Sequence, residues 1–418
     1  MNIVQVNNEI GQIKRVLVHR PGPETQRFPH GEFALAFPLR PTSSGFNLEQ
    51  AQAEHDALTT ALRESGATVI ELRDLLGETL AESPYVRREL IDRFLANCRI
   101  EGTELAEAAT QYLEGAPDDD QFIARLFEGI RYGDTALAET TRYPLAALTH
   151  SAFDPDTFLS GPLNTAFFMR DPLSAIGAGV SLNRMYWHDR NREVDILQTI
   201  IECHPAFADT PRWFDHGSSF HLEGGDVINL GETVLAVGLS SRTESLALDR
   251  LCQNLLWGDP RSTVTDIYVF EVPQSGNRLH LDAYLSPIDH DTFVVDPALT
   301  HGARVYHGRR GRKRGSVRIQ ERTEPLSRIL SDAVGGGPVR LLDFGKGGTD
   351  RMEFEYGNGA AGILSLAPGN LCVCAENLTA NEALSNAGMT LHPVSIQEMT
   401  AGFGGPNSLC LPLERESL

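Results

Sequence analysis

The segment HLEGGDVINLGETVLAVGL, residues 221–239, joins a polar turn with two glycines to a run of strand-forming residues. Valine, isoleucine and leucine favour extended backbone, whereas glycines within or beside a strand permit a close backbone approach. A short polar signature also accompanies β-rich sequence in MRDP and in HLD. The aspartates of the three signatures, Asp171, Asp226 and Asp282, are spaced by 55 and 56 residues.

This near-equal spacing predicts a repeated supersecondary unit in which each aspartate ends a strand and faces a common centre. Repeats of this size are typical of propeller-like or ring-like arrays. The alternative is a chance spacing among the 56 acidic residues of the chain.

The N-terminal part of the chain has the signals of alternating strands and helices. RVLVHRP, residues 15–21, predicts a strand stopped by proline, and residues 47–66 predict a helix between an Asn N-cap and a Gly stop. Residues 67–72 predict a second strand, so we expect an α/β chain.

Between residues 75 and 129 the pattern becomes helical, with Ser83 before Pro84 and acidic residues in predicted first turns. We expect residues 75–150 to form an all-helical insertion, with residues 1–74 and 151–418 forming the two parts of the α/β fold.

The composition limits the classes of partner. The 418 residues carry a net charge of -20, which disfavours nucleic acids and anionic membranes. The one strongly basic run, residues 307–318, has no interleaved aromatic residues, and we expect a solvated loop there. Six cysteines without a C-x-x-C pair indicate free thiols, and the absence of a signal-peptide pattern or a long apolar run favours a cytoplasmic protein.

Several polar side chains are candidates for chemistry. In HLD, a strand would place His280 and Asp282 on one face, where they could act in acid–base chemistry; a hydrogen-bonded edge histidine is the alternative. In EGGD, Glu223 and Asp226 flank two glycines. Two buried carboxylates facing a ligand would suit a guanidinium, which has five N–H donors in a planar fork; a β-bulge with surface carboxylates is the alternative.

Metal and phosphate sites are not favoured. His216 and His221 do not have the spacing of a helical zinc motif and would face opposite sides of an extended segment. None of the glycine-rich stretches has the pattern of a phosphate-binding loop. We therefore expect no metal and no cofactor.

Five motifs occur in one order: MRDP, LNRMYWHDRNRE, HGSSFHLEGGDV, LHLDAY and GGPNSLCLPLER. Together they resemble arginine deiminase, of the guanidino-group modifying (pentein) superfamily. The resemblance extends from about Leu163 to the end and more loosely to VLVHRPG. It implies a catalytic five-bladed α/β propeller of ββαβ-type units, interrupted by a helical insertion.

The resemblance also implies a reaction, the hydrolysis of L-arginine or a close ω-guanidino amino acid to citrulline and ammonia. A cysteine attacks the guanidinium carbon, and water hydrolyses the resulting covalent thiouronium. Asp171 and Asp282 would hold the guanidinium nitrogens, and Glu223 would orient the guanidinium and His280. His280 would protonate ammonia and then activate water.

Further positions match substrate-binding residues of the family. Arg190 and Arg242 match arginines that bind the α-carboxylate, which favours a free amino acid as substrate. The other matches are Asn164, Phe168 and Gly405. The segment LNTAFFMRDP is one residue longer than is usual in the family, and Phe403 replaces an arginine that often precedes the glycines.

The nucleophile position departs from the family pattern. With Gly404, Gly405 and Pro412 aligned, the family cysteine falls on Ser408 and not on Cys410. A serine hydroxyl is a far weaker nucleophile than a thiol at neutral pH. Ser408 is explained by an engineered Cys→Ser change, which we favour, by a natural inactive or repurposed homologue, or by the use of Cys410 after a local rearrangement.

The sequence therefore predicts an arginine deiminase-type enzyme, inactive or trapped because of Ser408. The alternatives are an amidinotransferase of the same superfamily, in which an amine replaces water, and a non-catalytic arginine-binding protein. The expected partners are a small-molecule substrate and other copies of the chain, in a dimer or a tetramer.

Overall fold

The structure is a computed structural model of the 418-residue chain. It describes residues 2–25, 46–100, 102–135, 155–274, 278–344, 350–400 and 404–418.

Five small sheets in the described part share one connectivity. In each, a first strand pairs antiparallel with a second strand, and the second pairs parallel with a third. The five sets are β19 (Leu411–Arg415), β1 (Ile13–Val18) and β2 (Thr68–Glu71); β5 (Leu173–Ile176), β6 (Gly179–Leu182) and β7 (Arg212–Phe214); β8 (Val227–Gly231), β9 (Val234–Leu239) and β10 (Asp266–Glu271); β11 (Leu285–Pro287), β12 (Thr292–Val295) and β15 (Arg340–Leu342); and β16 (Leu364–Ala367), β17 (Asn370–Cys374) and β18 (Thr390–Val394).

Helices connect the second and third strands, because parallel neighbours need a crossover connection. In the part of the chain that the structure describes, four units use one α-helix each: α2 (Leu48–Glu64), α8 (Asn191–Cys203), α9 (Ser245–Trp257) and α13 (Leu378–Asn386). In the fourth unit along the chain the connection contains α10 (Pro297–Gly302), β13 (Val305–Arg310), β14 (Val317–Arg322) and α11 (Leu326–Ala333). The predicted α/β character and the repeat are both confirmed by this connectivity.

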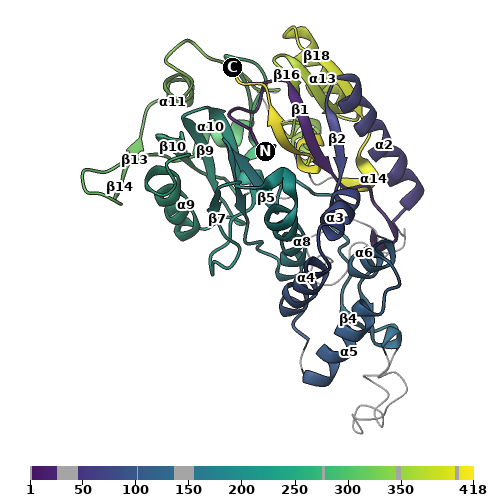
Figure 1. Ribbon diagram of the computed structural model, residues 1–418. Helices are drawn as coiled ribbons and strands as arrows, with labels where there is room; N and C mark the ends of the chain where they lie inside the picture. The colour runs from purple at the N-terminus through teal and green to yellow at the C-terminus, as the bar shows by residue number, and fades with distance from the viewer. Residues whose placement is uncertain are drawn as a thin grey trace.

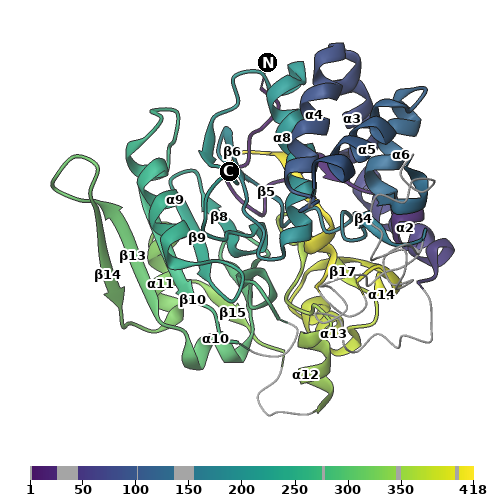
Figure 2. The same cartoon turned by 90° about the horizontal axis from the view of Figure 1, so that it is seen from below.

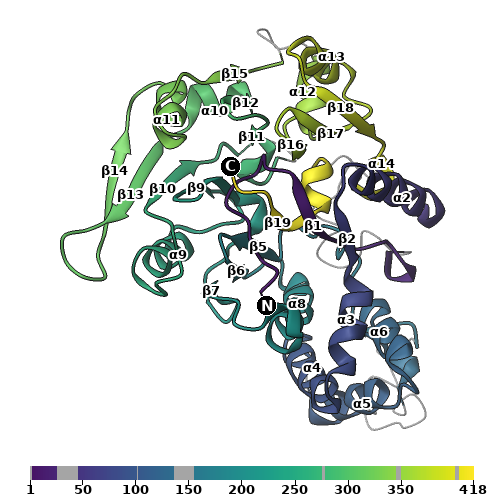
Figure 3. The same cartoon turned by 45° about the horizontal axis from the view of Figure 1, so that its top comes forward.

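The sheets lie around a common centre, with the connecting helices toward the outside (Figure 3). The first unit is completed by the C-terminal strand β19, which pairs with β1 near the N-terminus. One detail of the prediction was wrong. Asp171, Asp226 and Asp282 do not end strands but precede the first strand of their units, so they mark its start.

Four helices follow β2 and form a group at one corner of the molecule (Figures 1 and 2): α3 (Leu72–Ala81), α4 (Pro84–Ala96), α5 (Thr103–Glu114) and α6 (Asp119–Glu128). Ser83 caps α4 by accepting a hydrogen bond from the backbone N–H of Tyr85, and Pro84 occupies the first turn. The group packs on the rest of the fold through α3 and α4, which contact α8. Residues 136–150 of the predicted insertion lie outside the described residues.

The prediction of a solvated loop at the basic run, residues 307–318, was wrong. The run contributes most of β13 and the start of β14, which pair antiparallel at the edge of the β8–β9–β10 sheet. His307 donates to Asp266 at 2.7 Å and stacks on Tyr268 with 4.3 Å between ring centroids. The charges therefore belong to an edge hairpin, where charged side chains are common because they oppose pairing with other sheets.

Apolar side chains fill the space between each sheet and its helix. In the third unit, Leu251 and Leu255 of α9 join a buried cluster with Val237 of β9 and Ile267 of β10. Within the described residues, every helix is too short or too polar to cross a bilayer.

Candidate active site

The predicted site residues lie in turns that precede the first strands of the units. Short 3-10 turns occupy three of these places: η6 (Gly224–Asp226) before β8, η7 (Leu281–Ala283) before β11 and η8 (Pro406–Leu409) before β19. Asp171 holds the corresponding place before β5. Because these strands have equivalent positions in their units, the turns meet at the centre of the fold.

Backbone hydrogen bonds connect the turns. Gly224 N–H donates to the carbonyl of Asp171 at 2.9 Å, and Arg170 N–H donates to the carbonyl of Ser408 at 3.2 Å. Turns η6 and η7 are also in contact. The strand predicted for HLD was wrong, since His280 precedes η7 and Asp282 lies within it, so the contacts of each residue, and not strand alternation, set where its side chain lies.

The two glycines of EGGD are required by this close contact. A Cβ on Gly225 would lie 2.7 Å from the His280 ring, and a Cβ on Gly224 would lie 2.0 Å from the carbonyl oxygen of Arg170. Both distances are too short for a real side chain, so only glycine fits at either position.

His280 and Glu223 form the central pair. His280 Nε2 donates to Glu223 Oε2 at 2.7 Å, and the second oxygen of Glu223 accepts from the backbone N–H of Tyr186 at 2.9 Å. Burial alone would lower the pKa of His280, but the charge of Asp171, 3.8 Å away, and the hydrogen bond to Glu223 raise it to about 10. Burial would likewise raise the pKa of Glu223, but His280 and Arg242 lower it to about 2. The pair is therefore ionised at neutral pH.

Asp226 supports the backbone around His280 and Glu223 through hydrogen bonds. Its carboxylate accepts from the hydroxyls of Ser240 and Thr243, each at 2.6 Å, and from the backbone N–H of Leu281 at 2.9 Å. Thr243 in turn accepts from the backbone N–H of Glu223 at 3.1 Å. Burial raises the pKa of Asp226 to about 6, against the charge of nearby His280. Both EGGD carboxylates are thus hydrogen-bonded within the protein, Glu223 to His280 and Asp226 to Ser240, Thr243 and Leu281.

Asp171 is held by Arg190, whose Nη1 donates to Asp171 Oδ2 at 2.7 Å. The same guanidinium donates to both oxygens of Glu193 and to the carbonyl of Phe168 at 3.0 Å. These contacts use all but one of its five N–H donors, which leaves Arg190 a single donor for a ligand.

Arg242 has a different environment. Its Cζ lies 4.8 Å from the centroid of the Tyr186 ring and 5.3 Å from that of Trp187, which are cation–π distances. Its guanidinium donates no hydrogen bond to any residue that the structure describes. Arg242 is therefore a cation oriented by aromatic rings and available to an anionic group.

Asp282 is buried and accepts from Asn407 Nδ2 at 2.9 Å. Burial raises its pKa, and the charge of His280 opposes this only in part. Arg170 and Asn407 were not predicted as site residues, although they directly precede Asp171 and Ser408 in the motifs MRDP and PNSL.

Ser408 and Cys410 have opposite environments. Ser408 lies half-buried in η8, and its hydroxyl makes no hydrogen bond to a described residue. Cys410 is fully buried in an apolar cluster with Phe167, Leu409 and Cys372. Burial raises the pKa of the Cys410 thiol to about 12, so it is neither exposed nor ionised at neutral pH.

The remaining predicted residues are placed as follows. Gly405 precedes η8 and packs against Gly362, whose carbonyl oxygen would lie 2.2 Å from an added Cβ. The side chain of Phe168 lies in the core against Phe167, and only its carbonyl reaches Arg190. Asn164 is buried beside Glu193 at a small cavity and makes no hydrogen bond to His280 or Glu223. Phe403 lies outside the described residues.

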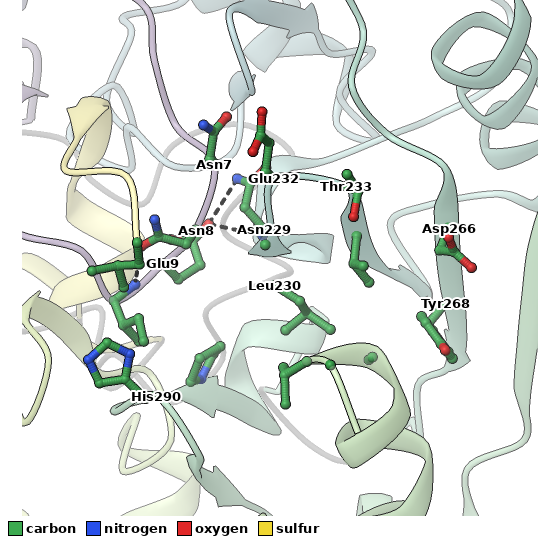
Figure 4. A pocket seen from close by; sticks show the side chains of 18 of the residues that line it. Asn7, Asn8, Glu9, Asn229, Leu230, Glu232, Thr233, Asp266, Tyr268 and His290 are labelled. Atoms are coloured by element: carbon green, nitrogen blue, oxygen red, sulfur yellow. Dashed lines mark hydrogen bonds between the residues drawn. The ribbon is translucent and has the colours of Figure 1, made fainter. Parts of the chain in front are cut away.

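Other polar groups lie apart from this centre. Among the described residues, no three His, Cys, Asp or Glu side chains are placed to hold a metal ion. His216 and His221 have carboxylate neighbours, Asp195 at 3.4 Å and Glu244 at 3.2 Å. A cavity of about 550 Å³, between the N-terminal loop and the β8–β9 turn, is lined by polar residues such as Asn7, Asn229 and Glu232 (Figure 4). It contains none of the predicted site residues.

Comparison with known proteins identifies the family of the chain. A model of the family described as arginine deiminase matches residues 43–415. An arginine deiminase from Treponema denticola is 30% identical over 420 residues, covering 100% of both chains. One from Clostridium perfringens is 32% identical over 419 residues, covering 99% of this chain and 98% of its own.

Solved structures with the same fold are more distant in sequence. An amidinotransferase of saxitoxin biosynthesis from Microseira wollei has a TM-score of 0.55 at 14% identity, covering 100% of this chain and 98% of its own. A dimethylarginine dimethylaminohydrolase from Pseudomonas aeruginosa, solved as a Cys→Ser mutant with citrulline, has a TM-score of 0.52 at 12% identity, covering 96% and 99%. The fold is thus a mixed α/β pentein fold, and the chain belongs to the arginine deiminase family.

Proposed function

We propose that this chain binds L-arginine, or a close ω-guanidino amino acid, in the manner of an arginine deiminase, and that serine at position 408 prevents turnover. We further propose that its five ββαβ units are the blades of a propeller with this site on its axis. The observation that carries the proposal is the convergence of Asp171, Glu223, His280 and Asp282 on the turn that contains Ser408.

The charges of the site suit a guanidinium. Asp171, Glu223 and Asp282 are carboxylates at a buried centre, and planar N–H donors match carboxylate oxygens. Two cations of this centre, His280 and Arg190, each pair with carboxylates of the protein. Arg242, with its unused donors, would bind the α-carboxylate of the substrate, and Arg190 would add one hydrogen bond.

With a cysteine at position 408, the geometry supports two chemical steps. The thiolate would attack the guanidinium carbon, and the C–N bond would break as His280 gives its proton to the departing nitrogen, releasing ammonia. Water would then attack the thiouronium carbon and lose one proton to His280. As the C–S bond breaks to release the thiolate, the remaining hydroxyl proton would pass to solvent, which gives citrulline. The raised pKa of His280 suits the first step, because the imidazole begins protonated.

Serine interrupts this sequence at its first step. A hydroxyl is far less ionised than a thiol at neutral pH, and His280 cannot act as its base because it is held as a cation. Cys410 is not a substitute, because its thiol lies in the apolar core. We therefore propose that the chain retains substrate binding without catalysis.

The test is the Ser408→Cys variant, assayed for citrulline and ammonia from L-arginine. We expect equal amounts of both products, at a rate at least about 1,000-fold above the unmodified chain, because the thiol is ionisable and more nucleophilic. A Ser408→Cys variant that also carries Cys410→Ala is the matched control and should be equally active. A folded Ser408→Cys protein that binds arginine without releasing products would contradict the nucleophile assignment.

The same assay distinguishes a deiminase from an amidinotransferase by their products. With glycine or another amine added, an amidinotransferase releases ornithine and a new guanidino product in place of citrulline. A chain that binds arginine but gains no turnover from Ser408→Cys would instead be a binding protein.

A further inference from the structure

A chain of buried hydrogen bonds connects Asp282 to the turn of Ser408. Asn407, one residue before Ser408, uses both ends of its side-chain amide. Its Nδ2 donates to Asp282 Oδ2 at 2.9 Å, and its Oδ1 accepts from Arg170 Nη2. Arg170 also donates from Nε to the Asn407 carbonyl at 3.3 Å, so one guanidinium holds both oxygens of Asn407.

This arrangement leaves Asn407 only one orientation. A guanidinium donates and never accepts, so the amide oxygen must face Arg170 and the NH₂ group must face the carboxylate. Rotation by 180° would place two donors together and an oxygen against Asp282. Asp282 Oδ1 makes no hydrogen bond to a described residue, so the donor from Asn407 leaves that oxygen for a ligand.

Arg170 is itself anchored in the core. Its Nη1 lies 3.5 Å from Glu9 Oε2, and Glu9 Oε1 accepts from Asn229 Nδ2 at 3.1 Å. Burial would raise the pKa of Glu9, but Arg170 and Arg415 lower it, so Glu9 is an anion beside the two arginines. Through Arg170, Glu9 of the N-terminal loop and Asn229 of β8 are connected to the site.

We propose that Arg170 and Asn407 are positioning residues, which fix the residue at position 408 and keep Asp282 an ionised acceptor for the guanidinium. The proposal rests on the proposed function, because the ligand is taken to be arginine. Arg170 is suited to this task by its place in the chain. Arg170 immediately precedes Asp171, and its backbone N–H donates to the carbonyl of Ser408. Through Asn407 it is also linked to Asp282, so it connects both aspartates to the turn that contains Ser408.

The test is Asn407→Asp in the full chain, with arginine affinity measured by calorimetry between pH 6 and pH 9. Aspartate retains the acceptors for Arg170 but faces Asp282 with a second carboxylate in place of a donor. Two carboxylates at hydrogen-bonding distance share a proton, and arginine must displace this proton in order to bind. We expect affinity about 10- to 100-fold weaker at pH 6, as for the loss of a hydrogen bond to a charged group, with recovery toward pH 9.

Asn358→Asp is the matched control. Asn358 is a buried asparagine outside the site, and its Nδ2 donates to Asn377 Oδ1 at 3.0 Å. It should lose stability without changing the dependence of arginine affinity on pH. If the Asn407→Asp profile superimposes on that of the unmodified chain, the positioning role is wrong.

Two further measurements keep the outcomes distinct. If Asn407→Asp does not fold, Arg170→Lys is the second variant. It keeps the positive charge but loses the bidentate contact of Arg170 with the two oxygens of Asn407. Its affinity for arginine should fall about 3- to 10-fold, with the same recovery at high pH. If the unmodified chain does not bind arginine, the proposed function fails. The pKa of Asp282, followed by carboxyl NMR without ligand, then decides the positioning role: it must rise in Asn407→Leu and stay constant in Asn358→Leu.

Discussion

Two regions of this protein bury a histidine near carboxylates, and the two histidines, His280 and His55, have opposite charge states at neutral pH. At the proposed active site, His280 donates to Glu223 at 2.7 Å, and its pKa is raised to about 10. In the N-terminal cluster, defined as His19, Glu24 and His55, His19 lies 2.9 Å from Glu24, and burial with the charge of His19 lowers the pKa of His55 to about 4.

The difference lies in what surrounds each imidazole. His280 faces Asp171, Glu223 and Asp226, so negative charge outweighs the cost of burial. His55 also has carboxylates nearby, Asp56 at 3.6 Å and Glu71 at 3.5 Å, but burial, together with the charge of His19, outweighs them and lowers its pKa. Proximity of a histidine to a carboxylate is therefore not enough to identify a site that transfers protons; the balance between burial and the charges around the ring decides.

The largest expected effect comes from Glu223→Gln. The change removes the carboxylate that pairs with His280 and one negative charge from the guanidinium site, so arginine affinity should fall by about 1,000-fold, or about 4 kcal/mol. The pKa of His280 should fall well below 10. Calorimetry and a histidine NMR titration measure the two quantities. An unchanged pKa would show that Glu223 does not hold the proton on His280.

The same change in the other region, Glu24→Gln, is the matched comparison. Glu24 is buried and accepts from His19 and from Gly22 N–H. Breaking a buried pair should lower the free energy of unfolding by about 3 kcal/mol. Arginine affinity of the folded protein should stay within about 3-fold of the unmodified value. Denaturant unfolding gives the stability. A large loss of affinity would mean that the two clusters are coupled.

The pH dependence of stability distinguishes the two regions further. His55 has a pKa of about 4 in the folded protein, below its usual 6.5, so the unfolded chain takes up a proton first. Its contribution to stability is complete above pH 6.5 and is lost as the pH falls toward 4. In His55→Gln, the decrease in unfolding free energy over this range should be smaller by about 3 kcal/mol. Equal slopes for the two proteins would contradict a neutral His55.

The smallest effect is expected at Arg242, at the rim of the proposed active site. Tyr186→Leu removes one of the two rings that orient Arg242, and a cation–π contact at a partly exposed position contributes about 0.5–1 kcal/mol. Arginine affinity should fall about 3- to 5-fold. Tyr85→Leu, at a highly exposed tyrosine of α4, is the control and should change nothing. An equal effect in both variants would exclude a role for the ring.

Much of this arrangement was predictable from the sequence. The spacing of Asp171, Asp226 and Asp282 predicted the repeat, and the ordered motifs predicted the family. The assignment of strands near the site was less successful. HLD has the alternation of a strand, but its residues form a 3-10 turn that brings His280 against Gly225. The basic run was also misread, because cross-strand pairing of β13 and β14 depends on a sheet edge distant in sequence.

The sequence by itself determined the residue types: four ionisable groups with a guanidine-binding pattern, and a serine at the position where the family pattern has cysteine. Only the tertiary structure decided how those groups are used. It turned Cys410 into the core, committed most of the donors of Arg190 to Glu193 and Asp171, and placed Asn407 between Arg170 and Asp282. The physical reason is that charge state and donor availability depend on burial and on partners from other units, which no local stretch of sequence contains.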